Sequence, residues 1–373
     1  MTSIFIAMIA VIAVSFSLLH KEYQYVKIHP EVVFSSDEEK EAYDFIFRNL
    51  ASESGGIYTN ALHSSSVGDL PGGSEILSES VGLILQYAIE SGSQTLFEKY
   101  FLYLKEVMMK KNLVIWKVDD QHKKKSGSNA LIDDLRICGL LIDASKKWGE
   151  EKYLKTGMGI AKGLRRYNVK NSFPIDFYDF KSTKSGNDLA IKYLDLNTIK
   201  KISDYDDSWK VVYSVSLEVF KNASAGKNDI FFMHRFDVKK RTYVSEPKVN
   251  MIELAIILEN SLKAGLKEDL TLGWIRENYF RDGFIVNEYG LDDGKAISKD
   301  ESPAVYAILS RVFSLQGDHD TANKLYKRML SMRVTDKNSK FYGGYANIKT
   351  GESFSFDNLQ ALITIRYKKN IDK

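Results

Sequence analysis

The chain has 373 residues, of which 44% are hydrophobic and 12% aromatic, so it is long enough to bury a large core. Its formal net charge of +3 is too small to indicate a nucleic-acid-binding protein, and the basic runs at 123–125 and 239–241 are interpreted as solvated loops. The single cysteine, Cys138, excludes an intramolecular disulfide and lies in an apolar stretch that favours a buried side chain.

The N-terminus carries an apolar segment from Ile4 to Leu19, followed at once by charged residues. This run is long for the core of a signal peptide and short for a membrane-spanning helix, and no Lys or Arg precedes it. No cysteine follows it closely, which argues against a lipid anchor. We expect residues 1–20 to be a signal peptide or membrane anchor that places the protein outside the cell, and 21–35 to be a linker. A buried N-terminal helix is the alternative.

Residues 36–373 are predicted to form one domain, because no Pro- or Gly-rich break interrupts them and the whole chain has only five prolines. Ser36 and Glu39 have the spacing of a capping box at the start of a first helix. Further amphipathic stretches follow in chain order, at 75–91, 93–110, 128–147, 150–166, 193–204, 208–222, 249–264, 268–279, 302–316, 318–332 and 355–368.

Tight turns join many of these stretches, so about twelve helices are expected to pair as hairpins. A series of hairpins builds either an open solenoid or a closed ring. The spacing is irregular and shows no consensus repeat, which argues against tetratricopeptide or armadillo arrays. We therefore predict an all-α fold, an (α/α)6 barrel, with the helices near 75–91 and 128–147 on the inside.

Five long segments between the hairpins are rich in Gly, Asp, Asn, Tyr and Phe. Loops of this length in a compact domain usually carry function. One apolar run within them, Ile230 to Met233, is the best candidate for a strand. The five segments are 51–74, 111–127, 167–192, 224–248 and 280–301.

Candidate chemistry begins with Glu79, which lies in the first turns of a predicted helix. A carboxylate there is stabilised by the helix dipole and stays ionised unless it is buried, so an ordinary helix-terminal charge is one interpretation. A general acid requires the opposite, a pKa raised by an apolar or anionic pocket. Downstream, Asp133 and Asp134 begin another apolar helix, where they serve as ordinary caps or as a local ion pair with Arg136.

Several short motifs occur in a fixed order along the chain. They are Ser78-Glu79-Ser80-Val81-Gly82, Trp116-Lys117, Asp133-Asp134 before Ile137 to Leu141, Trp148-Gly149, and Ile191 to Asp195. In this order and spacing the sequence resembles the glycoside hydrolases of family 8, over most of residues 50–330. It is more closely similar to divergent secreted members of Gram-positive bacteria that are linked to exopolysaccharide operons. The resemblance implies that Glu79 is the general acid.

The sequence departs from the family where the catalytic base is expected. The family's Tyr-Asp-Ala-x-Arg motif corresponds to 249–253 here, and Asn250 occupies the place of the basic Asp. An amide cannot deprotonate water. Another subgroup with Asn at this position recruits a carboxylate from an upstream loop, which makes Asp237 the expected base here and Glu246 the alternative. The family's Asp-rich helix start is also reduced to Asp133-Asp134, so either residue is a candidate for the sugar contact.

The resemblance therefore implies an inverting endo-glycosidase that acts on an extracellular polysaccharide. The residues expected to hold the sugar are Asp133 or Asp134, Tyr193, Trp116 and Asn250. The loss of the base at Asn250 motivates an alternative, a non-catalytic polysaccharide-binding protein. A polysaccharide lyase using His234 and Tyr243 is a weaker third. The six histidines are scattered without metal-ligand spacing, so no metal or cofactor is expected. The partners expected are a polysaccharide and, through the N-terminal segment, a membrane; no nucleic acid is expected, and the protein is predicted to be a monomer.

Overall fold

The structure is a computed structural model that describes residues 32–62, 72–123 and 125–371. Most of this part of the chain is helical, as predicted, and each amphipathic stretch corresponds to one helix. The twelve α-helices are α2 (Asp37–Asn49), α3 (Ser78–Ser91), α4 (Gln94–Tyr103), α5 (Leu131–Trp148), α6 (Glu151–Tyr167), α7 (Leu196–Ser203), α8 (Ser208–Lys221), α9 (Met251–Lys263), α10 (Asp269–Asp282), α11 (Pro303–Gln316), α12 (His319–Ser331) and α13 (Ser355–Ile371).

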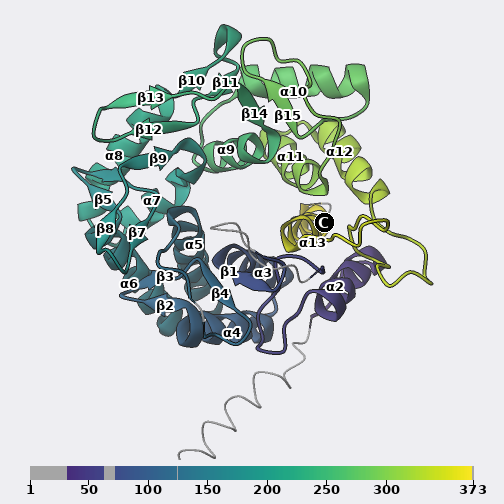
Figure 1. The fold of residues 1–373 in the computed structure, drawn as a ribbon, viewed down its shortest axis with the longest axis horizontal. Helices are drawn as coiled ribbons and strands as arrows, with labels where there is room; N and C mark the ends of the chain where they lie inside the picture. The colour runs from purple at the N-terminus through teal and green to yellow at the C-terminus, as the bar shows by residue number, and fades with distance from the viewer. Residues whose placement is uncertain (1–31, 63–71, 124, 372–373) are drawn as a thin grey trace, which may run out of the picture.

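Six of the helices form an inner series in which each contacts the next. The contacts run from α3 to α5, α7, α9, α11 and α13, and α13 in turn contacts α3. Helices α2, α4, α6, α8 and α12 pack on the outside of this series, and Figure 1 shows the helices arranged in a ring with α10 also on the outside. As predicted, α3 and α5 belong to the inner series. Alternation of inner and outer helices makes the inner helices run parallel, so their first turns meet at one end of the ring.

The difference between inner and outer helices is visible in their sequences. In the inner helix α11 every residue from Ala304 to Ser314 is buried, because neighbours cover all of its faces. In the outer helix α12 only four residues are buried, and its other face is charged. An apolar stripe is sufficient for a helix that faces the core on one side, whereas α11, which neighbours cover on all faces, has apolar residues around most of its circumference.

The predicted tight turns close three of the hairpins. Gly92, Gly149 and Gly317 follow α3, α5 and α11 with φ values of 74°, 72° and 92°. This left-handed conformation is costly for residues with a Cβ atom, and glycine therefore ends these helices.

Glu39 in α2 links the first described helix to the last one, α13. Its backbone N–H donates to Ser36 Oγ at 3.3 Å, as the capping box predicts. Its carboxylate does not return to Ser36; it accepts from Tyr87 Oη at 2.6 Å and from Arg366 Nε at 2.7 Å. Glu39 is completely buried and Arg366 nearly so. The first and last described helices are thus linked by a buried ion pair.

Short strands occur in the loops between the helices, and the fold is mostly helical. Each strand has two or three residues, and the predicted helix at 75–91 begins three residues late because its first residues form β1. The strands are β1 (Glu75–Leu77), β2 (Met109–Lys110), β3 (Leu113–Val114), β4 (Lys117–Asp119), β5 (Val169–Lys170), β6 (Phe173–Pro174), β7 (Tyr178–Asp179), β8 (Lys184–Ser185), β9 (Asp188–Ala190), β10 (Ser224–Ala225), β11 (Phe231–Phe232), β12 (Arg235–Asp237), β13 (Thr242–Val244), β14 (Lys248–Asn250) and β15 (Glu288–Gly290).

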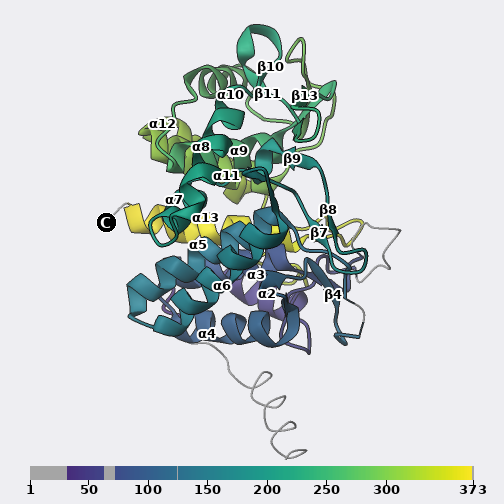
Figure 2. The ribbon, with the colours of Figure 1, turned by 90° about the vertical axis from the view of Figure 1, so that its left-hand side faces the viewer.

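The strands pair within and between the long loops. Strand β11, which lies in the apolar run predicted to be extended, pairs with β10, while β1 pairs with β4 and β14 with β15. Strand β12 lies between β9 and β13 in the three-stranded sheet. Strands β4, β7 and β8 lie on the same side of the molecule in Figure 2, opposite the C-terminal end of α13. The strands of two loops predicted to carry function, 111–127 and 167–192, therefore lie at one end of the ring.

The predicted N-terminal export segment and most of the linker lie outside the described residues. Within the ranges that the structure describes, no helix combines the length and apolar character needed to cross a lipid bilayer.

Candidate functional site

The first turns of the inner helices enclose a cavity of about 330 Å³. Helices α3, α5, α9 and α13 contribute Glu79, Asp133, Glu253 and Phe356 to its wall. Figure 1 shows that these helices stand around the centre of the ring. The cavity is lined by Leu77, Glu79, Trp116, Ala130, Ile132, Asp133, Lys192, Tyr193, Asn250, Ile252, Glu253, Ile256 and Phe356.

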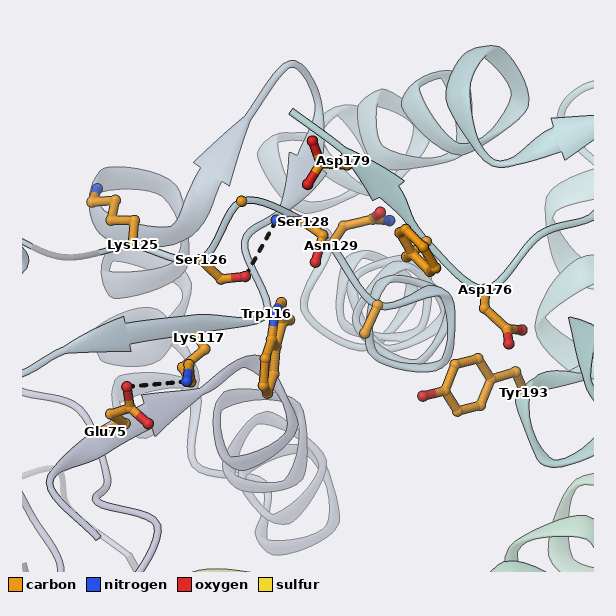
Figure 3. A pocket seen from close by; sticks show the side chains of 13 residues that line it. Glu75, Trp116, Lys117, Lys125, Ser126, Ser128, Asn129, Asp176, Asp179 and Tyr193 are labelled. Carbon is orange, nitrogen blue, oxygen red and sulfur yellow. Dashed lines mark hydrogen bonds and ion pairs between the residues drawn. The ribbon is translucent and has the colours of Figure 1, made fainter. Parts of the chain in front are cut away.

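A larger cavity of about 690 Å³ adjoins the first and shares Trp116, Ala130 and Tyr193 with it. In Figure 3 the rings of Trp116 and Tyr193 lie on two sides of this cavity, and Asp176 lies beside Tyr193. The remaining wall comes from β1, β4 and the loops before α5 and after β6, and includes Glu75, Lys117, Lys125, Ser126, Gly127, Ser128, Asn129, Phe177 and Asp179. The two cavities together make an elongated site with aromatic walls and acidic groups.

Glu79 is the second residue of α3, held at the cavity wall by the pairing of β1 with β4 just before the helix. Burial and, next, the negative charge of Asp133 together raise the pKa of its carboxyl to about 7, against the opposing effects of Arg136 and Lys192. The helix dipole favours an ionised group at this position, but the loss of hydration is the larger effect here. Glu79 therefore retains a substantial protonated fraction at neutral pH.

Asp133 stands next to Glu79 with both carboxylate oxygens occupied. Oδ2 accepts from Ser78 Oγ at 2.6 Å, and Oδ1 accepts from Arg136 Nη1 at 2.7 Å. Burial raises the pKa of Asp133, while Arg136 and Ser78 oppose the rise. Because Asp133 has a guanidinium partner and a hydroxyl donor, it is the charged member of the pair, and Glu79 is the member that holds the proton.

Asp134 points away from the cavity and is completely buried. Its Oδ2 accepts from Asn129 Nδ2 at 2.7 Å and its Oδ1 accepts from the Val114 N–H at 3.0 Å. Asp134 therefore connects β3 and the loop before α5 to the first turn of α5. Of the two aspartates proposed from the sequence, only Asp133 is among the described residues that line the cavity with Glu79.

Tyr193 lies between the two cavities, close to several carboxyl groups. Burial raises the pKa of its phenol well above its usual range, and the negative charges of Asp133, Asp176 and Glu79 raise it further. Asp176 accepts from the Ala190 N–H at 2.8 Å, and burial raises the pKa of its carboxyl to about 7. Tyr193 thus stays a neutral hydroxyl among acids, able to donate to a sugar oxygen.

Asn250 lines the Glu79 cavity at the start of α9, where its amide oxygen caps the helix. Oδ1 accepts from the N–H groups of Ile252 and Glu253 at 2.9 and 3.2 Å. Glu253, in the first turn of the helix, forms an ion pair with Lys192, and its second oxygen lies 3.7 Å from His234 Nδ1. Lys192 also lines the cavity, so a cation stands between acidic groups there.

The two bases proposed from the sequence lie elsewhere. Asp237 is at the end of β12, where its carboxylate accepts from the Lys240 N–H at 2.9 Å; that hydrogen bond lowers the pKa of Asp237. The described residues lining the two cavities do not include it. Glu246 is 48% exposed and lies 3.3 Å from His234 Nε2, on the far side of that ring from Glu253. The structure therefore brings Glu79, Trp116, Asp133, Tyr193 and Asn250 together and leaves Asp237 and Glu246 outside.

Three residues of the site were missed by sequence reasoning: Glu253, Lys192 and Asp176. Asp176 lies in the loop 167–192, which was already expected to carry function. Glu253 follows Asn250 by three residues in the same first turn, so helical spacing was the available signal for it. Within residues 32–62, 72–123 and 125–371, no group of three His, Cys, Asp or Glu side chains is arranged to hold a metal ion.

Comparison with known proteins gives a consistent picture. The family model described as glycosyl hydrolases family 8 matches residues 73–175, a range that includes Glu79, Trp116 and Asp133. The chain is 30% identical over 339 residues to a Bacillus subtilis (strain 168) protein named "Putative lipoprotein YdaJ", covering 88% of this chain and 87% of that protein.

Solved structures extend the similarity. A structure described as a novel alpha-amylase from Clostridium perfringens superposes with a TM-score of 0.83 at 32% identity, covering 89% of this chain and 97% of that one. An endo-1,4-D-glucanase from Vibrio fischeri ES114 superposes with a TM-score of 0.65 at 13% identity, covering 88% and 94%, and shares the fold.

Proposed function

The chain belongs to the family 8 glycosyl hydrolases, and on this premise we propose that it is an inverting endo-hydrolase of an extracellular polysaccharide. The single observation that carries the proposal is the state of Glu79. Its carboxyl lines a cavity, and its pKa is raised to about 7 by burial and by the neighbouring charge of Asp133. A general acid works best when its pKa lies near the working pH, and Glu79 meets that condition.

In the proposed reaction, Glu79 donates its proton to the glycosidic oxygen as the bond to the anomeric carbon breaks. A carboxylate on the other face of the sugar takes a proton from the attacking water. The two carboxyl groups of an inverting enzyme are about 6.5–9.5 Å apart, which leaves room for that water. The cavity wall contains other carboxylates besides Glu79, so in this proposal a base inside the cavity replaces Asp237, which is not among the described residues that line it.

The side chains around Glu79 suit a sugar at the point of cleavage. Asp133 and the amide of Asn250 offer hydrogen-bond acceptors and donors, and Tyr193 offers a hydroxyl. Trp116 lies in the wall of both cavities, where its ring can stack on a sugar face. The adjoining cavities have room for more than one sugar unit, which supports cleavage within a chain over removal of a terminal residue.

We propose an α-linked glucan as the first substrate to test. The support is the 32% identity to the protein described as an alpha-amylase, which extends over 97% of that chain. The glucanases and the xylanase among the similar structures share 15% identity or less, so they support the fold alone.

We also propose that the ring of helices is the (α/α)6 barrel of this family. The support is the continuous series of contacts from α3 through α13 and back to α3. An extracellular location is supported by the relative named a lipoprotein. The only cysteine of this chain, Cys138, is buried in α5, so the proposed export depends on the apolar segment near the N-terminus and not on a lipidated cysteine.

The proposal is tested by incubating wild type and Glu79→Gln with starch, glycogen, mixed-linkage β-glucan and xylan, and measuring new reducing ends. General acid–base groups contribute about 10²–10⁴-fold, so the variant should lose at least that order of rate while retaining polymer binding. Proton NMR of the first product should show an inverted anomeric centre. A wild-type protein that binds a polymer but releases no reducing ends between about pH 5 and 8 would establish the alternative, a polysaccharide-binding protein without catalysis.

A further inference from the structure

The inner helices α3 and α9 stand on opposite sides of the ring. Following the contacts in either direction, two inner helices separate them: α5 and α7 on one path, α11 and α13 on the other. Glu79 lies in the first turn of α3 and Glu253 in the first turn of α9, and both line the same cavity. Because inversion needs an acid and a base on opposite faces of one sugar, this pair has the required arrangement.

The other acidic groups near Glu79 are less suited to activate water. Both oxygens of Asp133 are occupied by Ser78 and Arg136, and Asp133 comes from α5, directly beside α3. The described residues lining the Glu79 cavity do not include Asp176, which faces the adjoining cavity. Asp357 is engaged by the Ser302 hydroxyl at 2.7 Å and by the Ala304 N–H at 3.2 Å.

Glu253 is held in place but keeps one oxygen accessible. Lys192 binds Oε1, and the cap formed by Asn250 fixes the backbone of Glu253. The other oxygen, Oε2, lies 3.7 Å from His234 Nδ1, which is longer than a hydrogen bond. The side chain of Glu253 is 30% exposed and lines the cavity, so water in the cavity can approach its carboxylate.

From these contacts we infer that Glu253 is the general base of the hydrolysis, standing in for the carboxylate that Asn250 lacks, with Lys192 as its positioning residue. The inference rests on the proposed function. Glu253 removes a proton from water as the water oxygen bonds to the anomeric carbon. Glu79 gives its proton to the departing glycosidic oxygen. Glu253 thus gains one proton and Glu79 loses one. After the products leave, Glu253 releases its proton to solvent and Glu79 takes one up from solvent.

The experiment compares Glu253→Gln with a matched control, Glu288→Gln. Glu288 is also ion-paired to a lysine, Lys248, is 29% exposed, and lies opposite Asn250 in the β14–β15 pair. The control should keep wild-type activity on the polymer that wild type cleaves. The Glu253→Gln variant should lose about 10²–10⁴-fold in kcat with a smaller change in KM.

Two further substrates separate a base from a merely structural residue. On an aryl oligosaccharide with a good leaving group, Glu79→Gln should recover activity, because the leaving group no longer needs a proton. Glu253→Gln should stay inactive on this substrate until azide is added. Azide attacks the anomeric carbon without losing a proton, and the expected product is the glycosyl azide of inverted configuration.

Each outcome is decisive. If wild type cleaves the polymer and Glu253→Gln matches it, the inference is wrong while the proposed function stands. If Asp176→Asn, Asp237→Asn or Glu246→Gln shows the azide-dependent recovery instead, that residue is the base. If wild type cleaves neither the polymer nor the aryl substrate, the proposed function itself fails.

Discussion

The two ends of the ring contain acidic groups that differ sharply in their surroundings. At the end where the inner helices begin, Glu79 faces the negative charge of Asp133, and burial raises its pKa to about 7. Toward the other end, Glu259 lines a cavity of about 220 Å³. Burial alone would raise the pKa of Glu259 as well, but the charges of Arg311 and Lys263 outweigh it and lower the pKa to about 2.

The difference teaches that burial by itself does not make a carboxyl a proton donor. Both glutamates lie within the ring of helices, and the sign of the nearest charge decides which one keeps its proton. Arg311 donates to both oxygens of Glu259 and is itself only 3% exposed. The negative charge of Glu259 is therefore balanced by a buried positive charge beside it. At the other end Arg136 donates to Asp133 and not to Glu79, so the Glu79 carboxyl has no guanidinium partner among the described residues and keeps its proton.

Removing the arginine at the neutralised end should give the largest effect on stability. Arg311→Met leaves the Glu259 carboxylate buried with only Lys263, and breaking a buried pair in this way typically costs about 3–5 kcal/mol. Chemical denaturation measures the loss. The matched control is Lys263→Met, whose side chain is 37% exposed and whose removal should cost under about 1 kcal/mol. Equal losses in the two variants would contradict the comparison.

At the acidic end, removing the charge should stabilise the protein. The folded-state pKa of Glu79, about 7, lies above its unfolded value of 4.5, so the folded state binds the proton more tightly. Its ionisation therefore destabilises the fold increasingly from pH 4.5 to 7, and fully above pH 7. Glu79→Gln should then be more stable than wild type by at most about 3 kcal/mol at pH 8 and show little gain at pH 4. A gain that does not depend on pH would point to another cause.

Much of the fold was predictable because hydrophobic periodicity and glycine-terminated turns are local signals. The end of α3 at Gly92 and that of α5 at Gly149 follow directly from the sequence. The start of α3 was placed too early, because Glu75–Leu77 pairs with β4, about forty residues away in sequence, and periodicity carries no information about such a partner.

The site was less predictable, because its chemistry depends on which groups the ring brings together. Local spacing favoured an ordinary helix-terminal charge for Glu79, and family resemblance was needed to select it. Asp133 and Asp134 are adjacent in sequence but face different surroundings, since successive helical residues are turned by about 100°. Glu253 was overlooked because its place opposite Glu79 depends on the order of the inner helices.

Substrate binding at the acidic end should depend on Trp116. Trp116→Ala removes the aromatic surface shared by the two cavities, and such contacts contribute about 0.5–1.5 kcal/mol beyond area burial, so KM should rise several-fold with a smaller change in kcat. Steady-state kinetics on the cleaved polymer measure this. Phe280→Ala, which removes an aromatic ring that is 49% exposed on α10, should leave KM unchanged.

The smallest expected effect is a displacement of the pH profile. The values of kcat/KM should fall as the pH rises through about 7, because Glu79 then loses the proton that it donates. Asp357 is one of the charges that raise the pKa of Glu79, and it contacts Ser302 and Ala304 outside the cavity wall. Asp357→Asn should move the alkaline fall to lower pH. A fall that moves upward or stays fixed would show that another group sets it.

The buried ion pair between Glu39 and Arg366 also has a consequence for the order of folding, because it joins two distant parts of the chain. The two residues are separated by 327 positions, so the ring cannot close until the chain has been synthesised as far as Arg366 in α13. Until then the faces of α3 and α11 that later contact α13 have no partner. Bringing the ends of so long a segment together has an entropic cost that local helix formation does not have. Helix α13 therefore completes the ring, because it contacts α3, α11 and α2. A chain truncated before α13 would leave Glu39 without its counter-ion.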